Sequence, residues 1–479
     1  GVRSPRGPPG GVAEGRAMPD LATLLPRLFS APGGPADVGL RAQAAAAYAG
    51  LLARAGDRAD PALCRHLDPI QAFLRGPAPA AIKRRLLCHP LLVEGLHALA
   101  PFAPVLRHWH DNVTTPPEPT PAECDTGAWA SLGNVALVAR LRSDRGWWGE
   151  HDCCTDVFGR VGFPLSDWTL TVRTDRGEFL TREAVTLSLG PDRAAWRLAG
   201  AGGPFLVMSR EACLRMLVDN ADPPDPRRVE FPDPSVRPCV QCAARLGRSA
   251  VRYDPVGFPP GHAHAGLTGG LVRRLFAAVR GNSPAVYREL RMFIHAVRGF
   301  ELPPTAHGVV GSFSDPTLPG VISVNVSYTP EGDPCIDPFC FTWLGHELGH
   351  TKDYLIDTVL HEGGLALTAN PTEPVGPIPR YGRTLPVRTL FQIPYVHLYE
   401  WALLMDFRAA GFRGLPWRVP PDAVAEAGED LAAEIREGFG LIREWARLTP
   451  AGAAALSHFR DLYAQATARW RSDTTGGGR

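Results

Sequence analysis

The sequence has few lysines, little net charge and no long apolar runs. Lys83 and Lys352 are the only lysines among 50 basic residues, so arginine carries nearly all of the positive charge. No apolar stretch reaches the roughly 20 residues of a transmembrane helix, and we therefore expect no membrane partner. The formal net charge of +1 gives no general attraction for a polyanion, so we also expect no nucleic-acid partner.

Several common signatures are missing too. The chain contains no Walker A phosphate-binding loop, no Gly-x-Gly-x-x-Gly fingerprint and no Gly-x-Ser-x-Gly nucleophile turn. The first residues, GVRSPRGPPGGVAEGRAMPD, lack the apolar segment of a secretory signal. We therefore predict a cytoplasmic protein whose ten cysteines are mostly reduced thiols.

The composition is that of an ordinary globular protein, with 45% hydrophobic and 21% charged residues over 479 positions. This length allows two or three domains with a large core. We expect an α+β fold, divided along the chain into a disordered leader at 1–19, a helical bundle at 20–111, a Pro-rich linker at 112–126, an α/β middle region at 127–266 and a C-terminal half at 267–471.

The spacing of apolar residues predicts the elements within these segments. Helical spacing marks most of 20–107, then 127–143 and 267–302. Alternation between turn-forming residues predicts short strands, at 167–174, 183–190, 194–200, 204–209 and 321–328. Residues 224–266 show no clear pattern, and strong helices are expected from 343 to about 363 and over 393–411.

The sequence FTWLGHELGHTKDYLIDTVLHEGG, at 341–364, contains an HExxH motif. His346 and His350 are four residues apart, so on a helix they lie on one face and can hold one divalent ion. Glu347 lies beside them and would act on a metal-bound water as general base in a zinc peptidase. The motif follows a predicted strand, and it makes 267–471 a zincin-like, metal-binding catalytic domain in our interpretation.

The third ligand is not where the long metzincin motif would place it. His361 lies about 16 Å along a continuous helix from His350, which is too far to share the ion. The helix predicted at 393–411 offers His397 and Glu400 on one face, with Tyr395 nearby as a further catalytic candidate. We favour His397 as the ligand, with Glu400 as the alternative; whichever does not bind the metal would support the other by a hydrogen bond.

These segments together resemble the HExxH-motif peptide-modification proteins, regarded as 2-oxoglutarate-dependent peptide β-hydroxylases. The resemblance rests on CHPLLVEGLHAL (88–99), SLGNVALVARLRS (131–143), GSFSDPTLPGVISVNVS (311–327), the motif helix, and RYGRTLPVRTLFQIPYVHLYEW (380–401). Two features depart from the family: Gln392 stands near a position where the family often has histidine, and an Arg-x-x-Pro-Trp-like element is imperfect.

The resemblance implies a reaction and a set of roles. Fe(II) would be held by His346, His350 and the third ligand, and 2-oxoglutarate would chelate the iron. An arginine would bind the distal carboxylate of 2-oxoglutarate through its guanidinium fork, the candidates being Arg380, Arg383 and Arg388. The substrate would be a ribosomal peptide or a protein, hydroxylated at a side-chain β-carbon.

Three functions remain open from the sequence. One is the iron and 2-oxoglutarate hydroxylase, the second is a zinc peptidase, and the third is a peptide-binding scaffold without turnover. Elsewhere, Cys239 and Cys242 form a CxxC pair that is a weak candidate for a structural zinc site, since four ligands are needed. The oligomeric state is not predicted.

Overall fold

A computed structural model describes the chain with gaps. The described residues are 21–32, 34, 37–58, 61–99, 121–155, 160–174, 183–199, 203–221, 227–228, 236–242, 244–245, 252–257, 263–300, 312–314, 318–325, 327–328, 334–335, 338–378 and 383–475. The leader predicted at 1–19 and most of the linker predicted at 112–126 lie outside them. The mixture of helices and strands agrees with the predicted α+β class.

The N-terminal segment is helical, as predicted. Its elements are α1 (Leu21–Leu28), α2 (Asp37–Arg58), α3 (Pro61–Arg75), α4 (Ala80–Leu87) and α5 (Pro90–Leu99). The helix predicted from residue 127 is α7 (Pro121–Ser143), which begins six residues earlier, inside the predicted linker. The start at Pro121 has a physical reason, because proline is well suited to the first turn of a helix, where no backbone N–H is needed.

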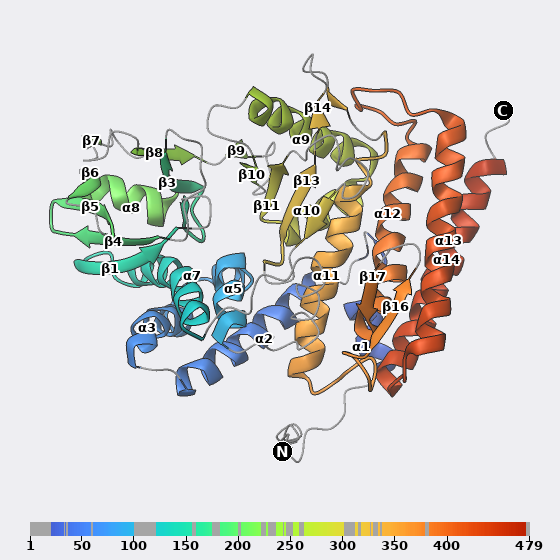
Figure 1. Ribbon diagram of the computed structural model, residues 1–479, viewed down its shortest axis with the longest axis horizontal. Coiled ribbons are helices and arrows are strands. Elements are labelled where there is room, and N and C mark those ends of the chain that lie inside the picture. Colours follow the sequence, from blue (N-terminus) through green and yellow to red (C-terminus); the bar gives the residue numbers. More distant parts are fainter. Residues whose placement is uncertain are drawn as a thin grey trace.

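Two antiparallel sheets occupy the middle region, on the left of Figure 1. Their elements are β1 (Gly149–Cys154), β2 (Arg160–Gly162), β3 (Trp168–Thr174), β4 (Ala184–Leu189), β5 (Arg193–Leu198), β6 (Pro204–Ser209), α8 (Arg210–Leu214), a π-helical turn (Arg215–Asp219), β7 (Arg227–Arg228) and β8 (Val236–Cys242). One sheet has the order β1-β4-β5-β6-β7 and the other β2-β3-β8. The four strands predicted here are confirmed, and the CxxC segment, predicted to be irregular, lies in β8.

A mixed sheet begins the C-terminal half. It has the order β12-β13-β11-β10-β9, with β10, β11 and β13 parallel and β9 and β12 antiparallel at its two ends. Its elements and neighbours are β9 (Ala244–Arg245), β10 (Arg252–Gly257), α9 (Ala263–Asn282), α10 (Pro284–Phe293), β11 (Ala296–Phe300), β12 (Ser312–Ser314), β13 (Val321–Asn325), β14 (Ser327–Tyr328) and β15 (Pro334–Cys335). Since β9 and β10 belong to this sheet, it crosses the boundary that the sequence suggested at residue 266.

One secondary-structure prediction in this region is wrong. The helix expected to run to residue 302 ends at Phe293, and residues 296–300 form the central strand β11. Pairing with β10 on one side and β13 on the other gives the backbone N–H and C=O groups of this short segment their hydrogen-bond partners. Tertiary hydrogen bonding therefore outweighs a local apolar spacing that is compatible with either structure.

Long helices complete the C-terminal half, on the right of Figure 1. They are α11 (Trp343–Glu362), α12 (Gln392–Ala409), α13 (Pro421–Trp445) and α14 (Pro450–Thr475), with β16 (Pro374–Ile378), β17 (Arg383–Pro386) and a 3₁₀ turn (Val387–Phe391) between α11 and α12. The helices predicted around the motif and over 393–411 are confirmed. The motif helix is continuous to Glu362, so His361 stays remote from His350.

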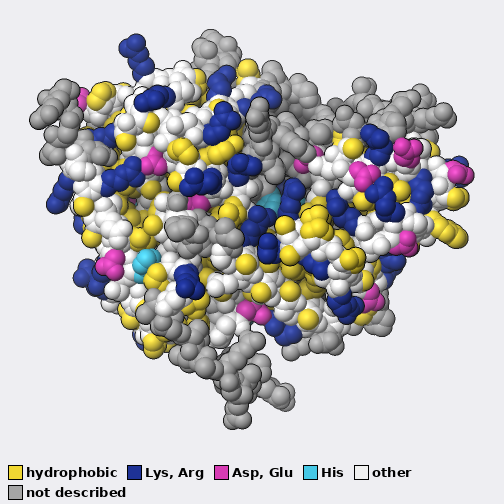
Figure 2. Space-filling model, turned by 180° about the vertical axis from the view of Figure 1, so that it is seen from behind, with side chains coloured by type: hydrophobic (Ala, Val, Ile, Leu, Met, Phe, Trp, Pro, Cys, Tyr) yellow, Lys and Arg dark blue, Asp and Glu magenta, His cyan; other side chains and the backbone are white. Residues whose placement is uncertain are grey.

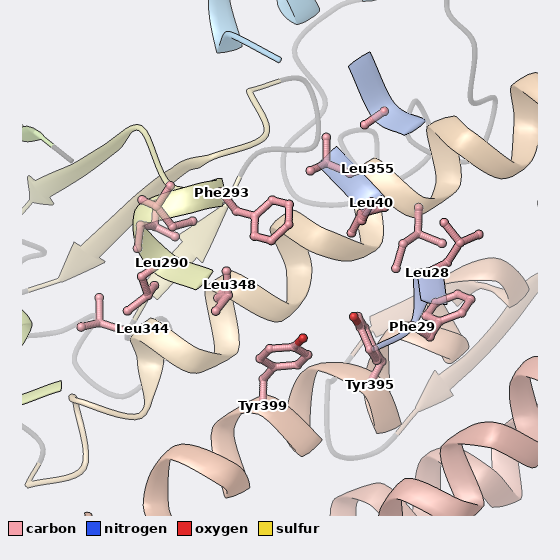
Figure 3. Packing of buried hydrophobic residues seen from close by; sticks show 14 of the residues in the cluster. Leu28, Phe29, Leu40, Leu290, Phe293, Leu344, Leu348, Leu355, Tyr395 and Tyr399 are labelled. Carbon is pink, nitrogen blue, oxygen red and sulfur yellow. The ribbon is translucent and has the colours of Figure 1, made fainter. Parts of the chain in front are cut away.

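The N-terminal helices share one core with the C-terminal helices. Leu28, Phe29 and Leu40 belong to the same buried cluster as Tyr395 and Tyr399 of α12 (Figure 3). Tyr48 of α2 also approaches the Thr358 hydroxyl of α11 at 3.5 Å. The described residues between 21 and 99 therefore share a core with the C-terminal helices, whereas the sheet of β1 and β4 packs over a second cluster that includes Trp196.

The surface carries arginine and lysine side chains scattered among hydrophobic ones on the face shown in Figure 2. Acidic side chains are fewer on this face, and a hollow near its centre contains a histidine flanked by basic side chains. Among the described helices, none is both long and apolar enough to cross a membrane.

Candidate metal centre

Two glycines bring the motif helix unusually close to α12. A Cβ atom on Gly345 would lie 2.8 Å from the carbonyl oxygen of Tyr399, and one on Gly349 would lie 2.9 Å from Cα of Val396. Neither position can take a larger side chain without moving a backbone. The spacing of four residues puts both glycines on one face of α11, so that α12 lies directly against the motif.

This approach creates a cluster of metal-binding side chains. Candidate ligand atoms of His346, His397 and Glu400 all lie within 4.8 Å of one another. His346 comes from α11, whereas His397 and Glu400 come from adjacent turns of α12. The sequence offered His397 and Glu400 as alternatives for one position, and the structure brings both to the cluster.

Glu400 is held by hydrogen bonds on both carboxylate oxygens. Its Oε2 lies 2.9 Å from Nδ1 of His346, and its Oε1 accepts a 2.9 Å bond from the hydroxyl of Thr342. Burial favours the neutral acid, but His346, His397 and Thr342 outweigh it and lower the pKa of Glu400 to about 2. Burial likewise opposes the charged form of His346, yet Glu400 raises its pKa. Glu400 therefore remains a carboxylate and fixes the ring of His346.

His397 is oriented by its own helix. Its Nδ1 lies 2.7 Å from the carbonyl oxygen of Ile393, one turn earlier, so Nδ1 carries the proton and donates it. The other ring nitrogen, Nε2, is therefore the atom that can bind an ion when it is unprotonated. Glu434 of α13 contacts this Nε2.

His350 is next to the cluster but outside that group of three. Its ring centroid lies 4.9 Å from that of His346, and the centroids of His346 and His397 are 5.3 Å apart. Two imidazoles bound to one tetrahedral ion at about 2.0–2.1 Å have centroids about 5 Å apart. Both spacings suit a shared ion, although the ring of His350 also stacks on Tyr354, at 5.9 Å.

Glu347 faces the sheet. Its Oε1 accepts a 2.7 Å hydrogen bond from the hydroxyl of Ser312 in β12, and its side chain is almost completely buried. Burial raises the pKa of Glu347, against the opposite effects of His346 and Ser312. Its Oε2 is buried without a hydrogen-bond partner in the part of the chain that the structure describes.

Tyr395, predicted as a catalytic candidate, lies in the hydrophobic core (Figure 3). Its ring packs 5.2 Å from Phe29, 5.3 Å from Tyr399 and 5.5 Å from Phe459. Two residues of helix are about 200° of rotation, so Tyr395 lies on nearly the opposite side of α12 from His397. The structure gives it a packing role and does not bring it into the cluster.

Arg388, predicted to bind the co-substrate, is buried and already paired. Its Nη2 donates bonds of 2.9 and 3.0 Å to both oxygens of Asp353, and its Nε donates a 2.7 Å bond to Asp357. Burial, and to a lesser extent the neighbouring carboxylate of Asp353, raises the pKa of Asp357 to about 6, against the opposite effect of Arg388. This guanidinium is therefore committed within the protein, which corrects its predicted role.

The other arginine and cysteine candidates are placed only in part. Arg380 lies outside the described residues, and Arg383 begins β17 with a side chain that is not described. Cys239 and Cys242 lie in β8, opposite Thr171 and Trp168 of β3. Their side chains are likewise not described, so the suggestion of a structural zinc site stays a prediction.

Sequence reasoning missed Thr342, Ser312 and Glu434. The first two carry no pattern of their own, because they reach the site only through the chain fold. Glu434 did leave a signal. It lies among the buried residues Leu431, Ile435 and Gly438 on the apolar side of α13, where an unexplained carboxylate is unusual.

The donor set suits a divalent transition metal. Imidazole nitrogen and carboxylate oxygen are ligands for zinc, iron and manganese, and the cluster supplies two imidazoles and one carboxylate. The buried Oε2 of Glu347 would also gain a partner from an ion or from its water. The residues therefore fit a metal ion.

Comparison with known proteins adds no relative. No protein-family model matches the chain, and no curated protein matches it.

Proposed function

We propose that this protein is a metal-dependent enzyme that hydroxylates a side chain of a peptide, with Fe(II) and 2-oxoglutarate. The observation that carries the proposal is the composition of the cluster. His346, His397 and Glu400 form a set of two histidines and one carboxylate, the donors that non-haem Fe(II) oxygenases use. The resemblance found in the sequence points to the same chemistry.

The chain's own residues have distinct tasks in this proposal. The ion would replace the proton that Nδ1 of His346 shares with Oε2 of Glu400, so that these two atoms bind it together with Nε2 of His397, whose Nδ1 bonds to Ile393. Glu347, fixed by Ser312, can accept a hydrogen bond or proton from a water at Oε2. When bound, Fe(II) with 2-oxoglutarate and O₂ supplies hydroxylation of a C–H bond, with succinate and CO₂ as the other products.

The strand beside the cluster favours a peptide substrate. The short antiparallel strand β12 lies at one end of the mixed sheet among the described residues. Its Ser312 bonds to Glu347 of the motif. A strand at the end of a sheet can pair with an extended peptide through main-chain hydrogen bonds. A peptide bound there would lie beside the metal ligands.

The distal carboxylate of 2-oxoglutarate still needs a cation. Because Arg388 is occupied by Asp353 and Asp357, the proposal assigns this task to Arg383 or Arg380. Both belong to the segment that precedes α12.

A zinc peptidase is the second candidate. The 4.9 Å spacing of the His346 and His350 rings on one continuous helix favours it. Against it, His350 is outside the group of three, which contains Glu400 instead.

An anaerobic absorption titration tests the proposal. Metal-free protein is titrated with Fe(II) and then with 2-oxoglutarate, and a new visible charge-transfer band is expected. The band should be lost in His397→Ala and kept in His361→Ala, which changes an exposed histidine at the far end of α11. Tight zinc binding, no band, and peptide cleavage that Glu347→Gln abolishes would overturn the proposal in favour of the peptidase.

A further inference from the structure

Three polar atoms are buried without a hydrogen-bond partner where the motif helix α11 packs against strand β12. They are Oε2 of Glu347, Oγ1 of Thr351 and Oγ of Ser314, and none of them bonds to a residue that the structure describes. Glu347 and Thr351 are each 1% exposed, and Ser314 is 4% exposed. A buried oxygen without a partner costs stability, so three of them at one contact between two elements need an explanation.

The geometry of the two elements turns these atoms towards one another. Glu347 and Thr351 are four residues apart on α11, so they lie on one face, and the Thr351 side chain tilts back towards the turn of Glu347. Ser312 and Ser314 are two residues apart on β12 and therefore share a face of that strand. Ser312 bonds to Oε1 of Glu347, and Ser314 helps to lower the pKa of the same carboxyl, so this face of β12 lies against Glu347.

The helix itself does not supply the partner that Thr351 needs. A threonine in a helix can donate to the carbonyl oxygen four residues earlier, as Thr358 does to Tyr354 at 3.0 Å. Thr351 makes no such bond to a described residue. Its hydroxyl is therefore available to a partner that lies between α11 and β12.

The proposed metal ion does not supply this partner either. Thr351 lies about 140° around α11 and about 7.5 Å along it from His346. An ion held by His346 and the ligands of α12 is therefore out of reach of the Thr351 hydroxyl. The three buried atoms belong to a second site, on the β12 side of the motif.

We infer that a resident water molecule occupies this second site, bound by Glu347, Thr351 and Ser314. A buried water makes about three hydrogen bonds, which matches the three unsatisfied oxygens. Oε2 of Glu347 accepts one proton of the water, and each hydroxyl either donates to the water or accepts from it. The inference rests on neither the metal ion nor the proposed reaction.

The water gives the motif glutamate a second anchor. Ser312 holds Oε1 of Glu347, and the water holds Oε2, so both oxygens of the carboxylate are fixed. The water also joins α11 to β12, the strand at one end of the mixed sheet as far as the structure describes it. The orientation of Glu347 therefore depends on Thr351 and Ser314, which lie outside the HExxH pattern.

A high-resolution crystal structure of the metal-free protein tests the inference directly. We expect density for one water at about 2.5–3.2 Å from each of the three oxygens. Thr351→Val keeps nearly the same side-chain shape but lacks the hydroxyl, so the density should weaken or disappear in that variant. A wild-type structure in which the three oxygens are satisfied without a water would overturn the inference, and it would leave the metal site and the proposed function standing.

A double-mutant cycle tests the same site in solution. Thr351→Val and Ser314→Ala should each lower the urea midpoint, and circular dichroism checks that every variant is folded. The double variant should lose less than the sum of the two single losses, because both changes act through one water. The crystal structure of the wild type decides the inference even where a variant fails to fold.

Thr358→Val is the matched control for this cycle. Thr358 is a buried threonine about 10 Å further along α11 than Thr351, and its hydroxyl bonds to Tyr354. Thr358→Val and Ser314→Ala should therefore give additive losses. Additive losses in both cycles would contradict a water shared by Thr351 and Ser314.

Discussion

Gly349 of the motif helix lies against the backbone of Val396 in α12, with 2.9 Å between a Cβ built on Gly349 and Cα of Val396. Val396 is the residue immediately before His397. The absence of a side chain in the middle of HExxH is therefore what allows the histidine of the second helix to reach His346.

Gly349→Ala should separate the two helices. The added methyl group meets backbone, which cannot rotate away, so we expect a loss of about 1–3 kcal/mol in the free energy of unfolding. Metal affinity should fall at least about tenfold, because the two helices carry different ligands. Urea unfolding and metal titration measure the two effects.

Gly270→Ala is the matched control for that change. Gly270 lies inside α9 with nothing within 4 Å of its Cβ position. Alanine there should stabilise the protein by about 0.5–1 kcal/mol through helix propensity and should not affect metal binding. Similar losses in both variants would show that the close helix contact is unimportant.

Lys352 forms a buried ion pair directly behind the motif. Its Nζ is fully buried and donates 2.7 Å to Glu289 and 3.0 Å to Ser30, and it also contacts the hydroxyl of Tyr399. Lys352→Met would leave the buried carboxylate of Glu289 without its cation, so we expect a loss of about 3–5 kcal/mol in the free energy of unfolding. Chemical denaturation measures it.

The double change Lys352→Met with Glu289→Leu removes both charges and should recover much of that stability. Lys83, the other lysine, is the control: its Nζ donates to the carbonyl of Gly76 at a partly buried site, and Lys83→Met should cost much less. A Lys352→Met variant as stable as Lys83→Met would contradict the importance of the buried pair.

His66 and His151 should make the protein sensitive to acid. Their rings pack 5.7 Å apart between α3 and β1, and Nε2 of His151 bonds the carbonyl of Gly133. Burial lowers both pKa values to about 4; the charge of His151 adds to this effect at His66, and that of Arg140 adds to it at His151. The folded state therefore resists protonation that the unfolded state accepts.

The sign follows from that difference. Above the unfolded pKa of about 6.5, both neutral rings contribute fully to the free energy of unfolding. As the pH falls towards 4, this contribution is lost, by up to about 3 kcal/mol for each ring. Urea unfolding at pH 7.5 and 4.5 should show that the free energy of unfolding falls less between these pH values in His151→Gln than in the wild type. Exposed His361→Gln should behave like the wild type, and an identical loss in all three proteins would refute the prediction.

Arg388→Lys should lower the stability of the protein but should not change its affinity for 2-oxoglutarate. Lysine cannot reproduce the fork that Arg388 directs at Asp353 and Asp357, so we expect a loss of about 3 kcal/mol. In the anaerobic titration, the 2-oxoglutarate affinity of the folded variant should stay within about threefold of the wild type. A variant of normal stability with greatly weakened 2-oxoglutarate binding would restore the role that the resemblance implied.

Periodicity alone predicted most of the local structure. Alternation located β4, β5 and β6 almost to the residue, and helical spacing located α11 and α12, because these segments bury one face and expose the other. The motif and its continuous helix were also predictable, including the exclusion of His361. Where both structures suited the local pattern, as at 296–300, pairing with neighbouring strands decided for β11.

The sequence by itself determined which side chains can bind a metal and that two of them, His346 and His350, share a helical face. Only the tertiary structure decided which partners they meet, because the approach of His397 and Glu400 depends on how α12 packs against α11. It also placed Tyr395 in the core and Arg388 in an ion pair, since burial depends on neighbours distant in the chain. Spacing along a helix follows from its geometry, whereas contacts between helices depend on side-chain volume at their crossings, here the glycines 345, 349 and 438.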